Sequence, residues 1–433
     1  MRILPLSLLL SLLGLAPSVR AQAPGVWSLH GQATFIIQGH GAFASPYQGP
    51  NSFQSRKETR CSFTGTLFLG RRLWKGAELC VNPEAAGGQG DSRVLGLAGA
   101  PNGEIYRVDS SEVKLGLARL FLRQTWDLGG APEALVPDLD QLGGSQSSRR
   151  LVLTAGRFSA SDVFDQNAYA HDPRTQFLNW ALMDTASWDY PADTRGYTWG
   201  LSLELIWDAW AVRAGSFLEP REANGMLFDP QVSRAHGDVV ELDHDHTFGG
   251  LAGSVRLMAY ANHARMGDYR ESLALDPAAP DITATRRPGR TKYGWGLSVD
   301  QALGADLGAF LRAGWNDGRT ETWAFTEVDR TGAAGLALAG CSWDRPEDRV
   351  GVAVVVNALS PEHRAYLAAG GLGFILGDGR LDAGQERIAE AYYALRAARG
   401  VTLSLDAQRV QDPGFNRDRG PVSIFALRVH GQF

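Results

Sequence analysis

The charged side chains of this chain that could contact a polar solute recur at every second position of otherwise apolar segments. Successive side chains of an extended strand point to opposite faces, so these charges would share one face. Arginine predominates, and its planar guanidinium can donate to two oxygen atoms at once and stack on flat rings. Each charge could contact a solute directly or only keep an interior hydrated, and both interpretations stay open. The candidates on this polar phase are Arg119, Arg123, Glu204, Arg213, Arg256, Arg312, Glu390, Arg396, Asp406, Gln408 and Arg428.

A second polar group lies in one long connection, SASDVFDQNAYAHDPRTQFLNWALMD, residues 159–184. It is longer than a surface turn requires, so we expect it to fold into the interior and form the narrowest part there. The alternative is a compact Ω-like loop packed outside. Its candidate residues are Asp162, Asp165, Asn167, His171, Asp172 and Arg174.

The same connection places His171 and Asp172 near Ser159 and Ser161, which could be drawn as a catalytic triad. In a loop of this composition, such proximity is far more often chance than catalysis. The sequence contains no G-x-S-x-G, H-E-x-x-H, Walker or Rossmann motif. It therefore predicts neither enzymatic activity nor a cofactor.

The segment VELDHDHT, residues 240–247, is the one local feature that suggests a metal. By phase, Glu241, Asp243 and Asp245 share the polar face, and a ring of carboxylates suits hard cations such as manganese. A cluster of this kind is more often a solvated strand end. These three residues are therefore weak candidates, and no metal site is predicted.

The elements that would position these side chains are strands with one apolar and one polar face. In GYTWGLSLELIWD, residues 196–208, Leu201, Leu203 and Leu205 alternate with Ser202 and Glu204. TKYGWGLSVDQ, VTLSLDAQ and the C-terminal SIFALRVHGQF repeat the division. The polar face is too polar for the core of a β-sandwich. The pattern predicts an all-β fold, a transmembrane antiparallel up-and-down β-barrel with its apolar face outward and a water-filled interior.

The connections set the number of strands at about sixteen, with short periplasmic turns and long extracellular loops. We expect the long loops near residues 39–58, 86–112, 158–195, 218–235, 267–290, 317–331, 359–385 and 411–420. One connection, residues 127–148, is long yet falls on the periplasmic side.

Aromatic residues gather at the predicted strand ends, as membrane-interface belts would require. At the periplasmic ends they are Trp74, Trp126, Trp207 and Trp210, and at the extracellular ends, facing outward, they are Tyr197, Trp199, Tyr293, Trp295 and Trp315.

The two ends of the chain indicate export and membrane assembly. Residues 1–21 have a basic start, an apolar run and a small-residue exit, which predicts a secretory signal peptide followed by a single barrel domain, residues 22–433. The last strand, ending on Phe433, has the pattern that the barrel-assembly machinery recognises, and segment 27–38 is its expected partner. The formal net charge is −5 and no block of like charge occurs, which argues against a nucleic-acid partner.

Several segments together resemble the carbohydrate-selective porins of the OprB family over essentially the whole mature chain. They are FASPYQGPNSF, TLFLGRRLWKGAELCVNPE, ARLFLRQTW, RGYTWG, NDGRTETWAFTEVDR and DRGPVSIFALRVHGQF. The resemblance implies passive diffusion of sugars through a barrel in the outer membrane of a Gram-negative-type bacterium, in contact with lipid and lipopolysaccharide. Relatives in the subgroup that this chain resembles are often described as high-affinity manganese porins, so divalent-metal uptake is the alternative. Monomer and trimer both stay open.

Overall fold

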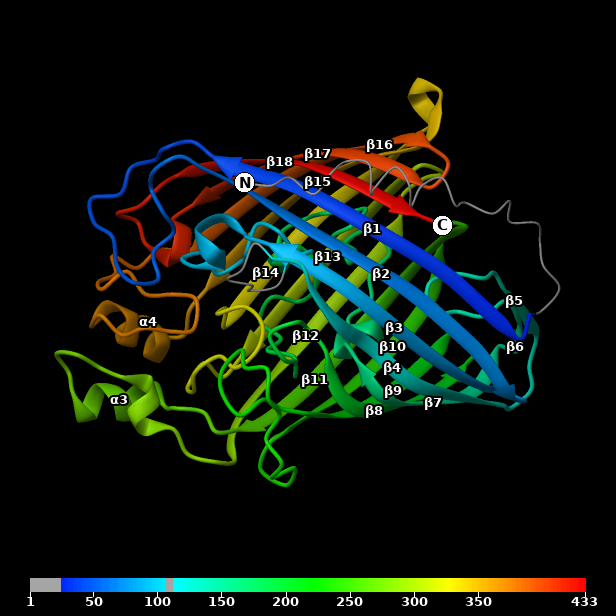
Figure 1. The fold of residues 1–433 in the computed structure, drawn as a ribbon, viewed down its shortest axis with the longest axis horizontal. Coiled ribbons are helices and arrows are strands. Elements are labelled where there is room, and N and C mark those ends of the chain that lie inside the picture. Colours follow the sequence, from blue (N-terminus) through cyan, green and yellow to red (C-terminus); the bar gives the residue numbers. More distant parts are fainter. Residues whose placement is uncertain (1–24, 106–111) are drawn as a thin grey trace.

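The computed structural model describes residues 25–105 and 112–433, which form one closed antiparallel barrel (Figure 1). The predicted signal peptide, residues 1–21, lies outside the described residues. Sixteen strands pair in the order β1-β18-β17-β16-β15-β14-β13-β12-β11-β10-β9-β8-β7-β4-β3-β2, and β2 closes the ring on β1. The predicted class and strand number are confirmed.

The barrel strands are β1 (Trp27–His40), β2 (Glu58–Trp74), β3 (Ala77–Gly88), β4 (Lys114–Asp127), β7 (Arg149–Phe158), β8 (Thr198–Trp207), β9 (Trp210–Leu218), β10 (His236–Phe248), β11 (Leu251–Ala264), β12 (Arg290–Ala302), β13 (Leu307–Asn316), β14 (Arg330–Gly340), β15 (Arg345–Ala358), β16 (Glu386–Ala398), β17 (Val401–Gln411) and β18 (Val422–Gln432). A separate two-stranded sheet contains β5 (Pro132–Leu135) and β6 (Gly144–Ser147). The α-helices are α2 (Trp180–Met183), α3 (Tyr269–Leu275) and α4 (Pro361–Ala368). Single 3-10 turns cover Asp91–Val94, Ala160–Asp162, Ile282–Thr285, Cys341–Trp343 and Pro413–Phe415.

The strands form because apolar and polar residues alternate with the period of a pleated strand. On β8, Leu201, Leu203 and Leu205 are exposed on the outer face, whereas Ser202 is fully buried inside. Closure leaves no unpaired strand edge, which a barrel surrounded by hydrocarbon requires. In the described part of the chain, no helix is long and apolar enough to cross a membrane.

The predicted partnership of the two terminal strands is confirmed. β18 pairs with β1 in antiparallel register, with Phe35 opposite Val429 and Ile37 opposite Leu427. The backbone of Phe433 exchanges two hydrogen bonds with Gly31, of 3.0 and 3.1 Å, so the final residue is still part of the wall.

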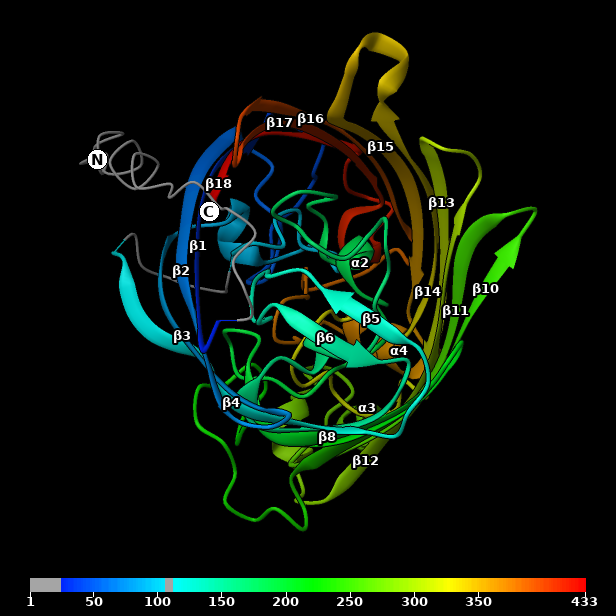
Figure 2. The same ribbon diagram turned by 90° about the vertical axis from the view of Figure 1, so that its right-hand side faces the viewer.

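The two ends of the barrel differ as expected. At one end the turns are short: two residues separate β8 from β9, β10 from β11, and β16 from β17. At the other end lie the long loops, including those that contain α3 and α4 (Figure 1). The exception is segment 127–148 at the short-turn end, which forms the β5–β6 hairpin and crosses the mouth of the barrel (Figure 2).

The interior is only partly open, because several long loops fold inward. Phe53, Leu97 and Phe177 of three loops belong to one buried cluster with wall residues that include Phe310 and Ile388. These loops narrow the barrel at its long-loop end. The aqueous space that remains is defined by the loops as much as by the wall.

Eight of the nine aromatic residues predicted at the strand ends agree with two membrane-interface belts. Trp74, Trp207, Trp210 and Trp295 are exposed at the strand ends. Tyr197, expected to face outward, is instead only 6% exposed and lies inside the barrel. It precedes the first residue of β8, so the alternation of that strand does not extend to it. The outward assignment of Tyr197 was wrong.

Candidate solute channel

The predicted constriction segment does fold into the barrel, and Arg312 of β13 anchors it from the wall. The Arg312 guanidinium donates from Nη1 to the carbonyl oxygens of Ala170 (2.5 Å) and Leu182 (2.6 Å), and from Nη2 to that of Asp165 (2.9 Å). Its Nε lies 3.3 Å from Asp165 Oδ1. The Arg312 side chain is 1% exposed, so it holds the loop and presents no surface to solvent in this structure.

A second set of wall residues fixes the next part of the loop. Glu390 of β16 accepts hydrogen bonds from the backbone N–H groups of Leu178 (2.5 Å) and Asn179 (3.1 Å). Arg428 of β18 donates to the carbonyl oxygens of Pro173 (2.5 Å) and Gln176 (2.9 Å). The Glu390 and Arg428 side chains are buried, so these hydrogen bonds are required to offset their desolvation.

Two residues of the neighbouring strand β17, Asp406 and Gln408, also help to hold this loop against the wall. Gln408 Oε1 accepts from the amide of Asn179 (3.0 Å), and Gln408 Nε2 donates to Asp406 Oδ1 (3.1 Å). Asp406 and Gln408 are both buried. Arg312, Glu390, Asp406, Gln408 and Arg428 therefore point inward as predicted, but they are covered by the loop.

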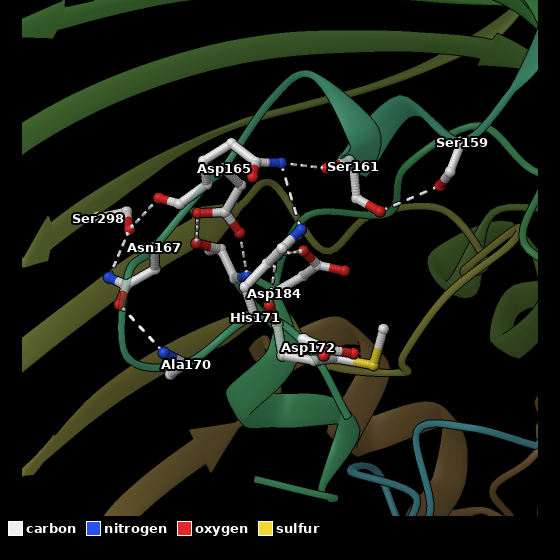
Figure 3. Close-up of polar contacts among 12 residues, drawn as sticks. Ser159, Ser161, Asp165, Asn167, Ala170, His171, Asp172, Asp184 and Ser298 are labelled. Carbon is white, nitrogen blue, oxygen red and sulfur yellow. Dashed lines mark hydrogen bonds and ion pairs between the residues drawn. The ribbon is translucent and has the colours of Figure 1, made fainter. Parts of the chain in front are cut away.

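Four of the six loop candidates are labelled in Figure 3: Asp165, Asn167, His171 and Asp172. Asp165 is buried and accepts from Thr185 Oγ1 (3.0 Å), and Asn167 Nδ2 donates to Ser298 Oγ on β12 (3.1 Å). Figure 3 shows His171 beside Asp184, with Nδ1 3.3 Å from Oδ1. The side chain of His171 remains partly exposed.

Neighbouring charged side chains shift the pKa values of three titratable residues in the loop. Burial lowers the pKa of His171, but the hydrogen bond and charge of Asp184 outweigh this and raise it above the usual value. Burial raises the pKa of Asp162, yet the Arg119 guanidinium holds it below the usual value. The pKa of Asp172 is lowered against the effect of burial by Arg174. The loop thus presents charges of both signs.

Two cavities meet at these residues. A cavity of ≈1400 Å³ lies on the side of the short turns and the β5–β6 hairpin, and one of ≈210 Å³ lies among the long loops. Four residues line both: Arg119, Asp162, His171 and Arg174. We call these four residues the constriction. Three of them were predicted in the loop, and one was predicted on the wall.

Arg119 owes its inward position to a β-bulge. Asn82 of β3 pairs with Arg119 and Pro83 pairs with Leu117, so Ala118 is an extra residue in β4. A bulge reverses the alternation locally, and Arg119 turns inward although Leu117 is exposed outward. Its Nε and Nη2 then make a bidentate pair with Asp162 (2.7 and 2.5 Å).

The inner face of the barrel wall from β8 to β12 carries paired charges, and two of them, Glu204 and Arg213, line the larger cavity. Arg213 of β9 lies 2.8 Å from Glu204 of β8 and 3.6 Å from Glu241 of β10. Further around the wall, Arg256 of β11 lies 2.5 Å from Asp300 of β12. Acidic and basic side chains thus alternate over five neighbouring strands. Paired charges keep the wall polar without giving it a strong net sign.

The acidic cluster of β10 does not match a metal site. Glu241 accepts from the backbone N–H of Asp165 (2.8 Å), Asp243 forms an ion pair with Arg213, and Asp245 accepts from Ser254 Oγ (2.6 Å) at the exposed end of the strand. Within residues 25–105 and 112–433, no group of three or more His, Cys, Asp and Glu side chains could hold a metal ion. The manganese alternative is not favoured.

Arg123 and Arg396 complete the predicted set. Arg123 lines the larger cavity and donates from Nη1 to the carbonyl oxygen of Asp140 (2.9 Å). Arg396 lies at the short-turn rim, 3.3 Å from Glu347, and lines neither cavity. Arg256 of β11 likewise lines neither cavity.

Three residues near the constriction escaped the sequence reasoning. Glu104 accepts from Arg174 Nε (2.7 Å), Tyr197 donates to Glu84 Oε2 (3.1 Å) and has Arg119 5.2 Å above its ring, and Asp140 comes from the hairpin. Glu104 and Asp140 belong to irregular segments, where no periodicity marks a side chain as inward. Only the unexpected length of segment 127–148 drew attention to it.

Comparison with known proteins decides the family. A family model described as "Carbohydrate-selective porin, OprB family" matches residues 55–433. The chain belongs to this family. This porin is therefore a channel protein of the Gram-negative outer membrane that admits carbohydrates by diffusion, and the predicted resemblance, localisation and function class are confirmed.

Solved structures agree on the fold. The high-pH structure of OprB from Pseudomonas putida matches with a TM-score of 0.70 and 17% identity, covering 94% of each chain. The low-pH structure of the same protein matches with a TM-score of 0.52 and 14% identity, covering 94% of this porin and 92% of that chain. The outer membrane channel DcaP of Acinetobacter baumannii gives a TM-score of 0.52 and 9% identity, covering 94% and 97%. Among curated protein sequences, none matches this porin significantly.

Proposed function

We propose that this porin selects neutral carbohydrates at the constriction formed by Arg119, Asp162, His171 and Arg174. The observation that carries the proposal is that these four residues line both cavities, so a solute passing between the cavities must contact them. Sugar hydroxyls both donate and accept hydrogen bonds. Guanidinium groups can donate hydrogen bonds to these hydroxyls, and the neighbouring carboxylates can accept hydrogen bonds from them. No covalent intermediate is needed.

The charge balance of the channel supports a neutral solute. Arg119 is paired with Asp162, and Arg174 is paired with Glu104. The wall charges of β8 to β12 are likewise paired. A channel for ions would carry an excess of one sign at its narrow zone. Passage is therefore down the concentration gradient and needs neither catalysis nor a cofactor.

The proposal includes how the porin reaches the outer membrane and what it contacts there. Residues 1–21 direct export, and residues 22–433 form the single barrel domain. Strand β18 and the C-terminal Phe433 that follows it present the barrel-assembly machinery with its recognition signal. The exposed apolar face, which includes Leu201, Leu205 and Phe425, contacts outer-membrane lipid and the acyl chains of lipopolysaccharide.

Liposome swelling tests the proposal. Purified porin is reconstituted, and swelling rates are measured in iso-osmotic solutions of neutral sugars, of non-sugar solutes matched in size, and of manganese chloride. We expect sugars to enter faster than the size-matched solutes, and the double variant R119Q/D162N to lose this difference. R387Q, a change on the exposed outer face of β16, is the matched control. Rates that follow solute size alone, or selective entry of manganese, would overturn the proposal.

A further inference from the structure

The β5–β6 hairpin is the part of the molecule that a minimal barrel does not need. Segment 127–148 connects β4 to β7 at an end where the other connections have two to four residues. Figure 2, which looks onto this end, shows the hairpin lying across the mouth. Its residues also line the ≈1400 Å³ cavity, among them Leu135, Leu139 and Gln141. A solute that leaves the constriction towards the periplasm must pass this hairpin.

The tip of the hairpin is fixed to the inner wall. An isolated two-stranded hairpin is marginally stable, so it needs such contacts to hold one position. Leu142 is 1% exposed against the wall at Gly70, and Arg72 Nη2 donates to the carbonyl oxygen of Gly143 (3.0 Å). Asn82 Nδ2 donates to Asp140 Oδ2 (2.7 Å). The tip is therefore tied to β2 and β3 and forms a built part of the channel.

The same tip brings a carboxylate to the constriction. Asp140 Oδ2 lies 3.8 Å from Arg119 Nε, and the Asp140 carbonyl oxygen accepts from Arg123. Asp162 approaches Arg119 at the same time from the long extracellular loop. Arg119 is thus placed between two carboxylates that belong to insertions from opposite ends of the barrel.

This position gives Asp140 an electrostatic role. Arg119 and Arg123 lie four residues apart on the inward phase of β4, and both line the larger cavity. Asp162 pairs with Arg119, whereas Asp140 contacts both arginines, Arg119 through its carboxylate and Arg123 through its carbonyl oxygen. An uncompensated positive charge in a narrow, partly desolvated passage attracts anions. Asp140 supplies the second negative charge.

We infer that the β5–β6 hairpin forms the periplasmic wall of the constriction and that Asp140 is a residue that determines its charge selectivity. The inference rests on the proposed function in that it treats the Arg119 region as the narrow zone. The hairpin limits the width of the exit, and Asp140 keeps the passage suited to uncharged solutes.

Ion selectivity in planar bilayers tests the role of Asp140. In a salt gradient, D140N is expected to raise the anion-to-cation permeability ratio by about threefold, the order of effect of one unit charge within a Debye length at intermediate dielectric. Asparagine keeps the size of the side chain, so the tip stays docked. D344N is the control, because Asp344 is an exposed carboxylate of a short turn at the same end of the barrel and lines neither cavity. An unchanged ratio in D140N, or an equal shift in D344N, would overturn the inference.

A hairpin variant tests the wall itself. Replacing residues 132–147 by two glycines should increase the single-channel conductance. The heat-modifiable electrophoretic mobility that marks the folded barrel should stay unchanged. Unchanged conductance in a folded variant would contradict the inference. If the deletion variant does not fold, L142D, which undocks only the tip of the hairpin, replaces it in the test. L142D should also raise the single-channel conductance, and an unchanged conductance in L142D would equally contradict the inference. These readouts use salt alone, so they remain informative even if sugar swelling contradicts the proposed function.

Discussion

Arg312 of β13 and Asp165 of the loop after β7 form an ion pair of 3.3 Å whose side chains are 1% and 2% exposed. A buried pair is tolerated when additional hydrogen bonds satisfy the remaining donors and acceptors. Arg312 meets this condition with three loop carbonyl oxygens, and Asp165 with Thr185. The pair is therefore a buried link between the barrel wall and the loop after β7, beside those made by Glu390 and Arg428.

Replacing Arg312 by leucine should release the loop without unfolding the barrel. The change leaves Asp165 buried and unpaired, which costs roughly 3–5 kcal/mol of loop stability. We expect a larger, noisier single-channel conductance and a loss of the preference for sugars. The double variant R312L/D165N should recover part of the wild-type behaviour, because the unpaired charge is removed. R396Q, at the rim, serves as control; wild-type conductance in R312L would contradict the anchoring role.

Arg119 is expected to respond differently from Arg312, since it lies at the boundary of both cavities. R119K keeps the charge but loses the bidentate fork to Asp162, so sugar entry should fall while ion selectivity stays near wild type. R119Q removes the charge and should shift permeability towards cations by roughly threefold. Bilayer reversal potentials and swelling rates measure the two effects. Identical behaviour of R119K and R119Q would contradict this assignment.

His171 predicts a pH dependence of selectivity. The pKa of His171 in the folded loop is raised by Asp184 against the effect of burial. The charged form therefore stabilises the folded loop: this contribution is fully present below the unfolded pKa of about 6.5 and is lost as pH rises through the raised folded pKa. Reversal potentials between pH 5 and pH 9 should shift towards cations as the positive charge disappears. H171Q should give a flat profile over this range, and a wild-type profile that is already flat would refute the prediction.

Asp91 predicts a second stability loss with rising pH, at a site in another extracellular loop. It lies in the 3-10 turn Asp91–Val94, is 1% exposed, and neither carboxylate oxygen has a hydrogen-bond partner among the described residues. Burial raises the pKa of Asp91 to about 6, although the charge of His40 opposes the shift. The folded state therefore binds this proton more tightly than the unfolded state, and stability falls as pH rises from about 4 through 6.

The substitution D91N should remove the loss of folding stability that Asp91 causes as pH rises. The variant should be more stable than wild type at pH 7.5, by at most about 3 kcal/mol from a shift of roughly two pKa units, and nearly equal to it below pH 4. Thermal unfolding in detergent at the two pH values measures the difference. D412N in another extracellular loop is the control, since Asp412 is partly exposed. A D91N variant that is destabilised at pH 7.5 would show that the carboxylate has a stabilising partner.

The amino-acid sequence by itself determined the barrel: sixteen strands, their inward and outward faces, and the two kinds of connection. Arg312, Glu390, Asp406 and Arg428 all point inward as their phase predicts. This information is local, because a strand between lipid and an enclosed interior must alternate at every second residue. The inward path of the loop after β7 was also predicted, from its length and polar composition.

Only the tertiary structure decided what each inward side chain does. Whether Arg312 meets solvent or the loop depends on where Ala170 and Leu182 lie, about 130 to 140 residues earlier in the chain. Tyr197 inside the barrel, and Asp140 beside Arg119, follow likewise from the paths of irregular segments. Such segments have no periodicity, and long-range hydrogen bonds and packing select their paths. The sequence therefore reveals the wall of the channel, whereas the folded loops define its opening.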